Sequence, residues 1–334
     1  MVLVAKTQLQ NAQHVKQQLN EVIDQRYYID KDASHIYFPV NEKIRHRLIT
    51  YMDRPMKGKL QPITLKQALS NKLTKHELEH LKTAFDTIGT IAIIEIDQVL
   101  EPKELRIAQT LLDNTPGIQT VVKKVGRHGG TFRTQKVKIL AGKRTKEALY
   151  KENGITLKLH IEKVYFSPRL LTERKRIMEQ VKPKETILVM FGGCAPYAVV
   201  LAKNTQATHI TTVELNPDAH QYATYNIEYN KADNVTAIHG DVTEVVPTLG
   251  TFERILMPLP KSAEDYLDTA LKAAKKGTVI HFYDFLEETQ FKQANHKIKE
   301  ACQRNNMSCT ILDTVKCGQH APHTFRICVD FKIN

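Results

Sequence analysis

The pattern of hydrophobic and polar positions changes near residue 166. Beyond this point short apolar runs alternate with amphipathic stretches. The runs "TILVMF", "HITTVEL", "VTAIHG", "RILM" and "TVIHFYDF" predict strands, and helices are predicted over 170–181, 217–230, 262–275 and 286–304. Continuous apolar strands that alternate with helices are typical of a parallel sheet covered on both faces. The sequence therefore predicts a doubly wound α/β domain from residue 166 to residue 334.

The residues before this domain predict two smaller α/β or α+β units. An amphipathic helix over 8–24 and short strands at "YYID" and "HIYFPV" indicate the first one. The segment "MDRPMKGKLQPITLKQAL", with two prolines and a glycine, is typical of a linker. Helices are then predicted over 65–86 and 102–114, and strands at "GTIAIIEI", "GIQTVVKKV", "TFRTQKVKIL" and "ITLKLHI". The predicted domains are 1–60, 61–165 and 166–334.

Composition and charge narrow the class of protein. The chain of 334 residues carries a net charge of +12 that is spread along its length, so we expect a folded basic surface and a polyanionic partner. No run of 18 apolar residues occurs, and the N-terminus has too few apolar positions for a signal peptide, so we expect no membrane span and a cytoplasmic location. The five cysteines form no C-x-x-C pair, which argues against a zinc site and a disulfide framework.

Three strand ends carry candidate cofactor residues. The turn "FGGCAP" after the first strand of the large domain contains Gly192 and Gly193, which allow a ligand to approach the backbone closely. Glu214 ends the second strand, where an acid usually binds ribose hydroxyls, and Asp241 ends the third, where an adenine edge would lie. Each acid alone is equally consistent with a solvated helix cap. Together, and without a pyrophosphate loop, they indicate S-adenosylmethionine.

A stiff loop follows the fourth strand. In "FERILMPLPKSAEDYL" the strand must end near Met257, because Pro258 and Pro260 have no N–H to give to a sheet. The loop lies at the same sheet edge as the cofactor motifs, so it is expected to form a wall of the methyl-acceptor pocket. The alternative is a turn that only stops the strand.

These motifs resemble the archaeal and eukaryotic-type tRNA (guanine-37-N1)-methyltransferase family, with its wyosine-pathway relatives. The resemblance covers essentially the whole chain and is most specific in "YKENGITLKLHIEKVYFSPRLLTERKRIMEQV", "ELNPDAHQYATYNIEYNK", "GTVIHFYDF" and "VDFKIN". It implies a Rossmann-type class I methyltransferase domain preceded by two domains that recognise RNA.

The resemblance also implies roles for individual residues. Glu173 matches the carboxylate proposed as general base, Arg133 the arginine that contacts the target guanine, and Tyr165 an active-site residue. The implied cofactor contacts are Arg174, Phe191, Gly192, Gly193, Glu214, Leu215, Asp241, Val242 and Pro258. The implied substrate contacts are Arg133, Tyr165, Arg169, Pro258 and Pro260. Without the family, Arg133 would be equally consistent with a phosphate contact, and Glu173 and Arg174 with a helix-surface pair.

Three departures from the family pattern stand out. Val189 occupies the place of an acid at the end of the first strand, and "APHTF" lacks a basic residue that is sometimes present. Pro258 stands where the family has an asparagine that binds the guanine edge. Because relatives that methylate C7 of a tricyclic wyosine precursor also lack this asparagine, the departure bears on the acceptor atom.

The leading hypothesis is methyl transfer from S-adenosylmethionine to N1 of guanine 37 in tRNA by a monomer that needs no metal. The first alternative is C7 methylation of a 4-demethylwyosine-type base, alone or in addition. A non-catalytic tRNA-binding protein and a small-molecule methyltransferase are the alternatives of other classes. The first is disfavoured by the intact candidate residues, and the second by the two upstream basic domains.

Overall fold

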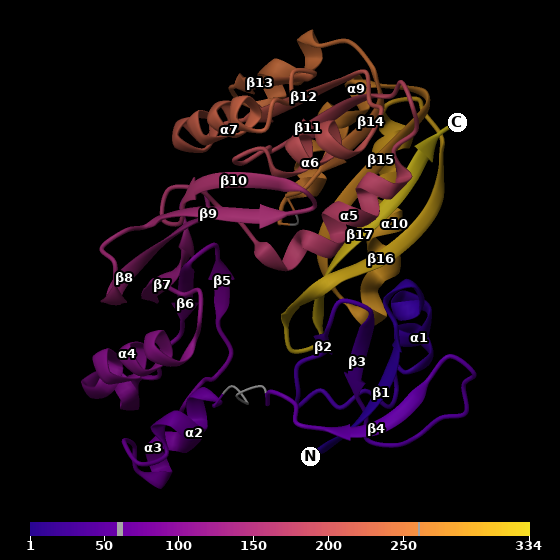
Figure 1. Ribbon diagram of the computed structural model, residues 1–334. Helices are drawn as coiled ribbons and strands as arrows, with labels where there is room; N and C mark the ends of the chain where they lie inside the picture. The colour runs from indigo at the N-terminus through magenta and orange to yellow at the C-terminus, as the bar shows by residue number, and fades with distance from the viewer. Residues whose placement is uncertain (59–62, 260) are drawn as a thin grey trace. The chain divides into compact units, whose positions relative to one another are not determined.

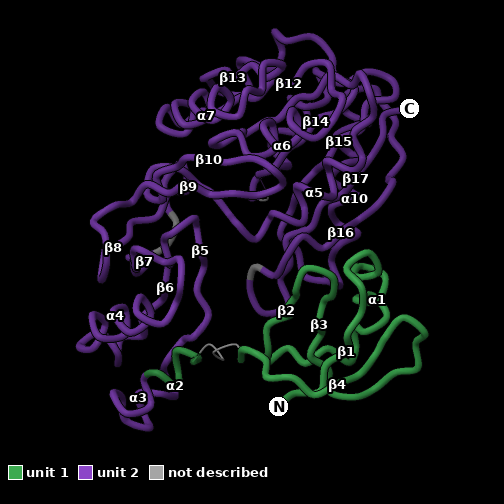
Figure 2. The backbone as a smooth tube through the Cα atoms, viewed as in Figure 1, with its two compact units in different colours: residues 1–68 green, residues 69–334 purple. Residues whose placement is uncertain are grey.

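The computed structural model describes residues 1–58, 63–259 and 261–334 (Figure 1). The chain divides into two compact units, residues 1–68 and 69–334 (Figure 2), and each is described by itself. No helix among the described residues is both long and apolar enough to cross a membrane.

The first unit contains a four-stranded sheet against which a short helix packs. The strand order is β2-β3-β1-β4, and β1 pairs antiparallel with both β3 and β4. The elements are β1 (Val2–Gln8), α1 (Ala12–Gln18), β2 (Asp30–Lys31), β3 (His35–Pro39) and β4 (Thr50–Arg54). The helix predicted over 8–24 is shorter than expected, because residues 9–11 form a 3-10 turn and the chain turns again directly after Gln18. Val15 and Leu19 of the helical region pack on Ala5 and Phe38 of the sheet.

The second unit begins with a small α+β region. Its sheet has the order β5-β6-β7-β8, in which only β6 and β7 run parallel. Helix α2 (Leu65–Leu69) crosses the boundary between the two units, and the other elements are α3 (Lys75–Glu79), β5 (Asp86–Ile88), β6 (Ile91–Ile94), α4 (Glu104–Asn114), β7 (Thr120–Gly129) and β8 (Thr134–Gly142). The single helix predicted over 65–86 is two short helices. Thr74 starts the second with a capping box completed by Glu77, which fixes a helix N-terminus inside the predicted span.

A hairpin of β9 (Glu147–Glu152) and β10 (Ile155–His160) leads into the large domain. The large sheet has the order β13-β12-β11-β14-β15-β17-β16, and its first five strands are parallel. The strands are β11 (Thr186–Met190), β12 (His209–Glu214), β13 (Val235–His239), β14 (Phe252–Met257), β15 (Ala274–Glu287), β16 (Cys309–Ala321) and β17 (Thr324–Ile333). The last two pair antiparallel at one edge. This is the doubly wound sheet that the sequence predicts.

Helices cover both faces of this sheet. They are α5 (Leu171–Gln180), α6 (Pro196–Asn204), α7 (Pro217–Tyr229), α8 (Val242–Val245), α9 (Leu267–Lys272) and α10 (Phe291–Arg304). Along β11, Ile187 and Val189 enter the core shared with α6 and α7, whereas Leu188 and Met190 enter the core shared with α9 and α10. A strand buried on both faces explains the continuous apolar run in the sequence. The strand order reverses beside β11, so a ligand crevice is expected at the carboxyl ends of β11 and β14.

Candidate functional site

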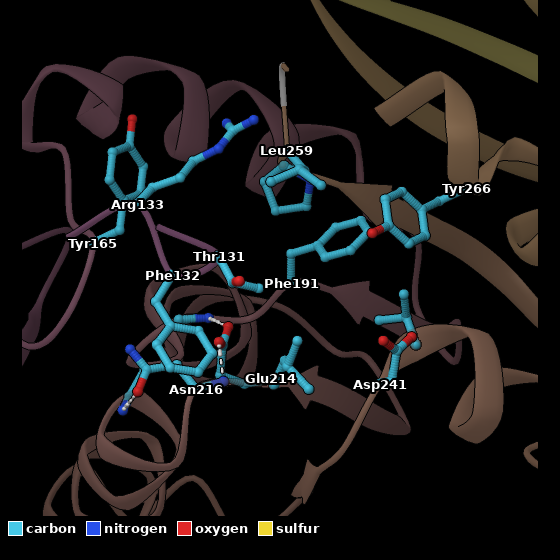
Figure 3. Close-up of a pocket in the computed structure, with 15 residues that line it drawn as sticks. Thr131, Phe132, Arg133, Tyr165, Phe191, Glu214, Asn216, Asp241, Leu259 and Tyr266 are labelled. Carbon is cyan, nitrogen blue, oxygen red and sulfur yellow. Dashed lines mark hydrogen bonds between the residues drawn. The ribbon is translucent and has the colours of Figure 1, made fainter. Parts of the chain in front are cut away.

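A cavity of about 150 Å³ opens at this sheet edge (Figure 3). It combines loops after β11, β12, β13 and β14 with the turn between β7 and β8 and with the segment before α5. The lining residues are Thr131, Phe132, Arg133, Tyr165, Phe191, Gly193, Glu214, Leu215, Asn216, Ala219, Asp241, Val242, Pro258, Leu259 and Tyr266. Nine of the residues singled out in the sequence are therefore brought together here.

The turn after β11 is tight because its backbone takes left-handed conformations. Phe191 and Gly193 both have φ of 57°. Gly192 does not line the cavity; a Cβ atom on it would lie 1.9 Å from Oγ1 of Thr212 in the neighbouring strand. Its N–H donates to the carbonyl of Val213 at 2.8 Å. The absence of a side chain at residue 192 thus serves the close packing of the turn on β12.

Glu214 is fixed by backbone donors from two segments. Its carboxylate accepts the N–H of Gly193 at 2.7 Å and the N–H of Asn216 at 2.8 Å. Burial raises the pKa of the Glu214 carboxyl above its ordinary value, although these backbone bonds act in the opposite direction. A carboxylate has about four acceptor sites. Glu214 therefore retains acceptor capacity for the two hydroxyls of a ribose, and the residues present fit an adenosine group.

Asp241 and Asn216 both cap helices at the cavity. One oxygen of Asp241 accepts the N–H and the hydroxyl of Thr243, each at 2.7 Å, and starts α8. Its second oxygen has no hydrogen-bond partner among the described residues. Asp241 is thus a helix cap, which is the alternative interpretation of its place in the sequence, and it also lines the cavity. Asn216 caps α7 and donates to the carbonyl of Lys163 at 2.7 Å. The sequence did not single out Asn216, although its place in the motif "ELNP", directly before a helix, could have indicated it.

Aromatic and apolar side chains form the remaining wall beside the cofactor motifs. Phe191 and Tyr266 meet edge to face with ring centroids 4.9 Å apart (Figure 3). Leu215 and Val242 also line the cavity. The sequence contained no periodic or motif signal for Tyr266, which reaches the site only because the segment after β14 folds back.

The other end of the cavity carries the candidate acceptor residues. Arg133 sits in the β7–β8 turn with φ of 50°, and one terminal nitrogen donates to the carbonyl of Lys261 at 2.6 Å. Burial lowers the pKa of its guanidinium. Tyr165 accepts a hydrogen bond from Arg326 at 3.0 Å. Pro258 lines the cavity, whereas Pro260 lies outside the described residues.

Three further residues singled out in the sequence do not line the cavity. Arg174 is only 1% exposed, and its guanidinium bonds both carboxylate oxygens of Glu152 at 2.5 and 2.6 Å. Arg169 donates to Asp86 at 2.7 Å on the surface. Glu173 is buried as well, and the ion pair with Glu152 holds the Arg174 guanidinium in the core rather than in the cavity lining.

The Glu173 carboxylate is held by several donors. Arg176 donates to both of its oxygens at 2.8 Å, and the hydroxyl of Tyr283 donates to one at 2.7 Å. Arg176 also donates to Asp330 at 2.6 Å. Glu173 is therefore one end of a chain of buried charges, with its charge balanced by Arg176.

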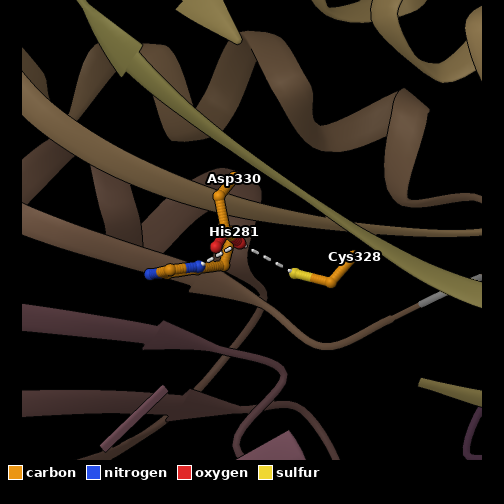
Figure 4. Close-up of side chains that lie close together, drawn as sticks. All are labelled: His281, Cys328 and Asp330. Atoms are coloured by element: carbon orange, nitrogen blue, oxygen red, sulfur yellow. Dashed lines mark hydrogen bonds and ion pairs between the residues drawn. The ribbon is translucent and has the colours of Figure 1, made fainter. Parts of the chain in front are cut away.

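The chain of charges continues to His281, Cys328 and Asp330, which lie close together (Figure 4). Nδ1 of His281 bonds Asp330 at 2.6 Å, Nε2 bonds Arg254 at 2.6 Å, and Cys328 donates to Asp330 at 3.2 Å. Arg254 can only donate, so the His281 ring is neutral with its proton on Nδ1; burial lowers the pKa of His281. The side-chain N, O and S atoms of these three residues that could bind a metal form hydrogen bonds to other protein groups. Through Asp330, which accepts a hydrogen bond from Arg176, the cluster also holds the Arg176 guanidinium in place.

Comparisons with known proteins fit this geometry. The profile of the TRM5/TYW2 methyltransferase domain matches residues 148–312, and that of the TYW2 N-terminal domain matches residues 65–145. The chain is 30% identical to the tRNA (guanine(37)-N(1))-methyltransferase Trm5b of Pyrococcus abyssi over the whole of both chains. It is 33% identical to the tRNA 4-demethylwyosine(37)-methyltransferase Taw21 of Saccharolobus solfataricus, over 75% of this chain and 93% of the relative.

Two solved structures are similar along almost the entire chain. The complex of aTrm5 with tRNALeu has a TM-score of 0.74 at 27% identity, and the match covers 100% of both chains. Trm5 of Methanocaldococcus jannaschii in complex with adenosine has a TM-score of 0.69 at 26% identity, with 99% of both chains covered. The resemblance noted in the sequence and the Rossmann-type fold are thereby confirmed. The chain belongs to the TRM5/TYW2 methyltransferase family.

Proposed function

We propose that this protein transfers a methyl group from S-adenosylmethionine to N1 of guanine 37 in tRNA. The observation that carries the proposal is that one cavity joins the two sets of residues the chemistry needs. Glu214 and Asp241 lie at one end, and Arg133, Tyr165 and Pro258 at the other. The relatives' names and the tRNA and adenosine complexes support the same activity and substrates.

The cofactor end would bind the adenosine portion of S-adenosylmethionine. Glu214 would accept bonds from the ribose hydroxyls, and Asp241 would accept from the adenine edge. The cofactor supplies an already activated methyl group on a sulfonium, so no metal is required in this proposal. The residues Leu215, Val242 and Tyr266 would exclude water from the adenosine.

At the acceptor end, the main work of the protein is alignment and charge stabilisation. Loss of the N1 proton places negative charge on O6 of guanine, and the Arg133 guanidinium is the donor that would stabilise it. Guanine 37 would have to leave the anticodon-loop stack to enter the cavity. Pro258 gives this pocket a stiff apolar wall.

We propose Glu173 as the proton acceptor. In the structure its carboxylate does not line the cavity, so direct transfer requires a side-chain movement when RNA binds. Catalytic hydrogen bonds are often long before substrate binds and tighten in the complex, so the free geometry does not exclude this role. A Glu173→Gln variant that keeps its full single-turnover rate would contradict it.

The domain roles belong to the same proposal. Residues 1–60 would recognise tRNA, residues 61–165 would bind RNA and deliver Arg133, and residues 166–334 would hold the cofactor. The first unit, residues 1–68, supports this with eleven Lys and Arg against six Asp and Glu. Several of its cations lie over tyrosine rings, including Arg54 at 4.0 Å from the ring centre of Tyr37. Truncation of residues 1–60 should raise the KM for tRNA and leave cofactor affinity unaltered.

A second acceptor is C7 of 4-demethylwyosine. The specific observation is that Pro258, which replaces the family asparagine, lines the acceptor end of the cavity. A proline offers an apolar face to a tricyclic base and no side-chain hydrogen bond to guanine. The relative that is named for this substrate supports the alternative.

The test is nucleoside analysis of tRNA after incubation with protein and isotopically labelled S-adenosylmethionine. The proposal predicts labelled N1-methylguanosine in transcript tRNA with guanine at position 37. Label only in a tricyclic base, supplied in precursor tRNA, would favour the alternative. We expect the active species to be a monomer in the cytoplasm. Sedimentation of the active protein would check that it is a monomer.

A further inference from the structure

Arg326 is a second arginine at the acceptor end that the sequence did not single out. It lies at the start of β17, opposite Phe285 in the antiparallel pair with β15. One terminal nitrogen donates to the hydroxyl of Tyr165 at 3.0 Å, and its guanidinium lies 5.2 Å from the ring centre of Phe285. Tyr165 lines the cavity and Arg326 does not, so Arg326 is linked to the cavity through its hydrogen bond to Tyr165.

The contacts of Arg326 leave its charge uncompensated. These contacts, to Tyr165 and Phe285, include no carboxylate among the described residues, and its Nε is buried without a hydrogen-bond partner. The Glu173 carboxylate is engaged by Arg176 and Tyr283. Arg326 is half-buried, and a partly desolvated guanidinium that lacks a carboxylate partner is less stable than a paired one.

A second cation increases this cost. The charge of Arg326 acts on Arg133 in the direction that lowers the pKa of Arg133, with burial as the larger cause. The carboxylates that line the cavity, Glu214 and Asp241, both belong to the cofactor end. Two guanidinium groups that repel each other beside a cavity are stabilised when an anionic ligand enters.

We propose that Arg326 is a second cation of the acceptor site, which acts with Arg133 through its charge and through Tyr165 to stabilise an anionic oxygen of the target nucleotide. This inference rests on the proposed function and extends it to a residue outside the family motifs. Two oxygens of the nucleotide have the required chemistry. One is O6 of guanine, which gains charge as N1 loses its proton, and the other is a backbone phosphate beside the flipped base.

Two substitutions separate charge from contact. Arg326→Gln retains an N–H donor for Tyr165 but loses the charge, whereas Arg326→Lys retains the charge and loses the planar fork. We expect Arg326→Gln to lower kcat/KM about 10- to 100-fold, less than the roughly 10²- to 10³-fold for a donor in direct contact with a developing anion because Arg326 does not line the cavity, and Arg326→Lys to recover most of this loss. The matched control is Arg304→Gln on α10, whose bond to Asp268 at 3.3 Å lies on an exposed surface; it should leave kcat/KM unchanged.

Single-turnover rates and tRNA affinity identify the oxygen. A fall in rate at saturating tRNA with unchanged Kd for tRNA assigns Arg326 to O6, and a weaker Kd with an unchanged rate assigns it to phosphate. Cofactor affinity measured by calorimetry shows that each variant is folded at the site. Equal activity of Arg326→Gln and wild type overturns the inference, as does an equal loss in the Lys and Gln variants, which would assign only packing to Arg326. Absence of any methylated product with the wild type would instead be a failure of the proposed function.

Discussion

The two ends of the cavity are built in different ways. At the cofactor end, Gly193, Glu214 and Asp241 follow three adjacent parallel strands, and backbone N–H groups fix the central carboxylate. At the acceptor end, Arg133 and Tyr165 come from segments far from these strands, and Arg133 is held by the carbonyl of Lys261. The order of the parallel strands is enough to bring the residues of the cofactor end together. The residues of the acceptor end meet only through tertiary packing of separate segments. Changes at the two ends should therefore affect different measurements.

The largest expected effect tests whether Arg174 is a residue of the protein core rather than of the cavity. Glu152→Gln leaves the Arg174 guanidinium buried without its carboxylate partner. Loss of one partner from a buried pair typically costs about 3–5 kcal/mol, so the free energy of unfolding should fall by that amount. Chemical denaturation measures it, with Glu179→Gln, an exposed helix pair with Lys175, as the control that should change little. An unchanged unfolding free energy for Glu152→Gln would show that Arg174 is not locked in the core.

The next effect tests the acceptor end. Arg133→Gln should lower the single-turnover methylation rate by about 10²- to 10³-fold, because a donor to the developing O6 charge is lost. Cofactor affinity should stay the same, since no cofactor motif is altered. Parallel rate measurements and calorimetry check both halves of the prediction. Weakened cofactor binding would mean that the two ends are not separable.

The matching change at the cofactor end is Glu214→Ala. It should weaken S-adenosylmethionine binding by about 1.5–3 kcal/mol, the range for losing a hydrogen-bonded charged partner. Calorimetry on the folded variant gives the number directly. At saturating cofactor the methylation rate should recover toward wild type, which Arg133→Gln should not do. Unaltered affinity would remove Glu214 from the cofactor site.

The smallest effect is a change of preference. Pro258→Asn should raise activity on guanine relative to the tricyclic base, because the asparagine adds a polar contact worth about 1–3 kcal/mol. The ratio of rates on the two tRNAs should shift about five- to 150-fold. A ratio that does not move in a folded variant would leave the loop as a strand terminator.

The common position of Gly193, Glu214 and Asp241 at one sheet edge could be predicted from sequence, because each lies at the end of an apolar strand. Tyr266 and Asn216 could not be placed as firmly. The position of Tyr266 depends on how the segment after β14 folds back. The sequence around Asn216 indicates a helix cap and gives no sign that the residue also lines a cavity. The buried position of Arg174 also could not be predicted from the sequence, because its partner Glu152 lies on a hairpin 22 residues earlier in the chain. Helix lengths in the first half were overestimated because a 3-10 turn at Leu9–Asn11 and a helix cap at Thr74 interrupt the amphipathic stretches.

The central claim is that the joined cavity methylates N1 of guanine 37. The most direct measurement is mass spectrometry of the anticodon-loop oligonucleotide from transcript tRNA after reaction with labelled S-adenosylmethionine, combined with primer extension. The account predicts one added methyl group at position 37 and an arrest of reverse transcription there, since N1 methylation blocks the pairing edge. A methyl group at another nucleotide, or full extension through a methylated position 37, would contradict it.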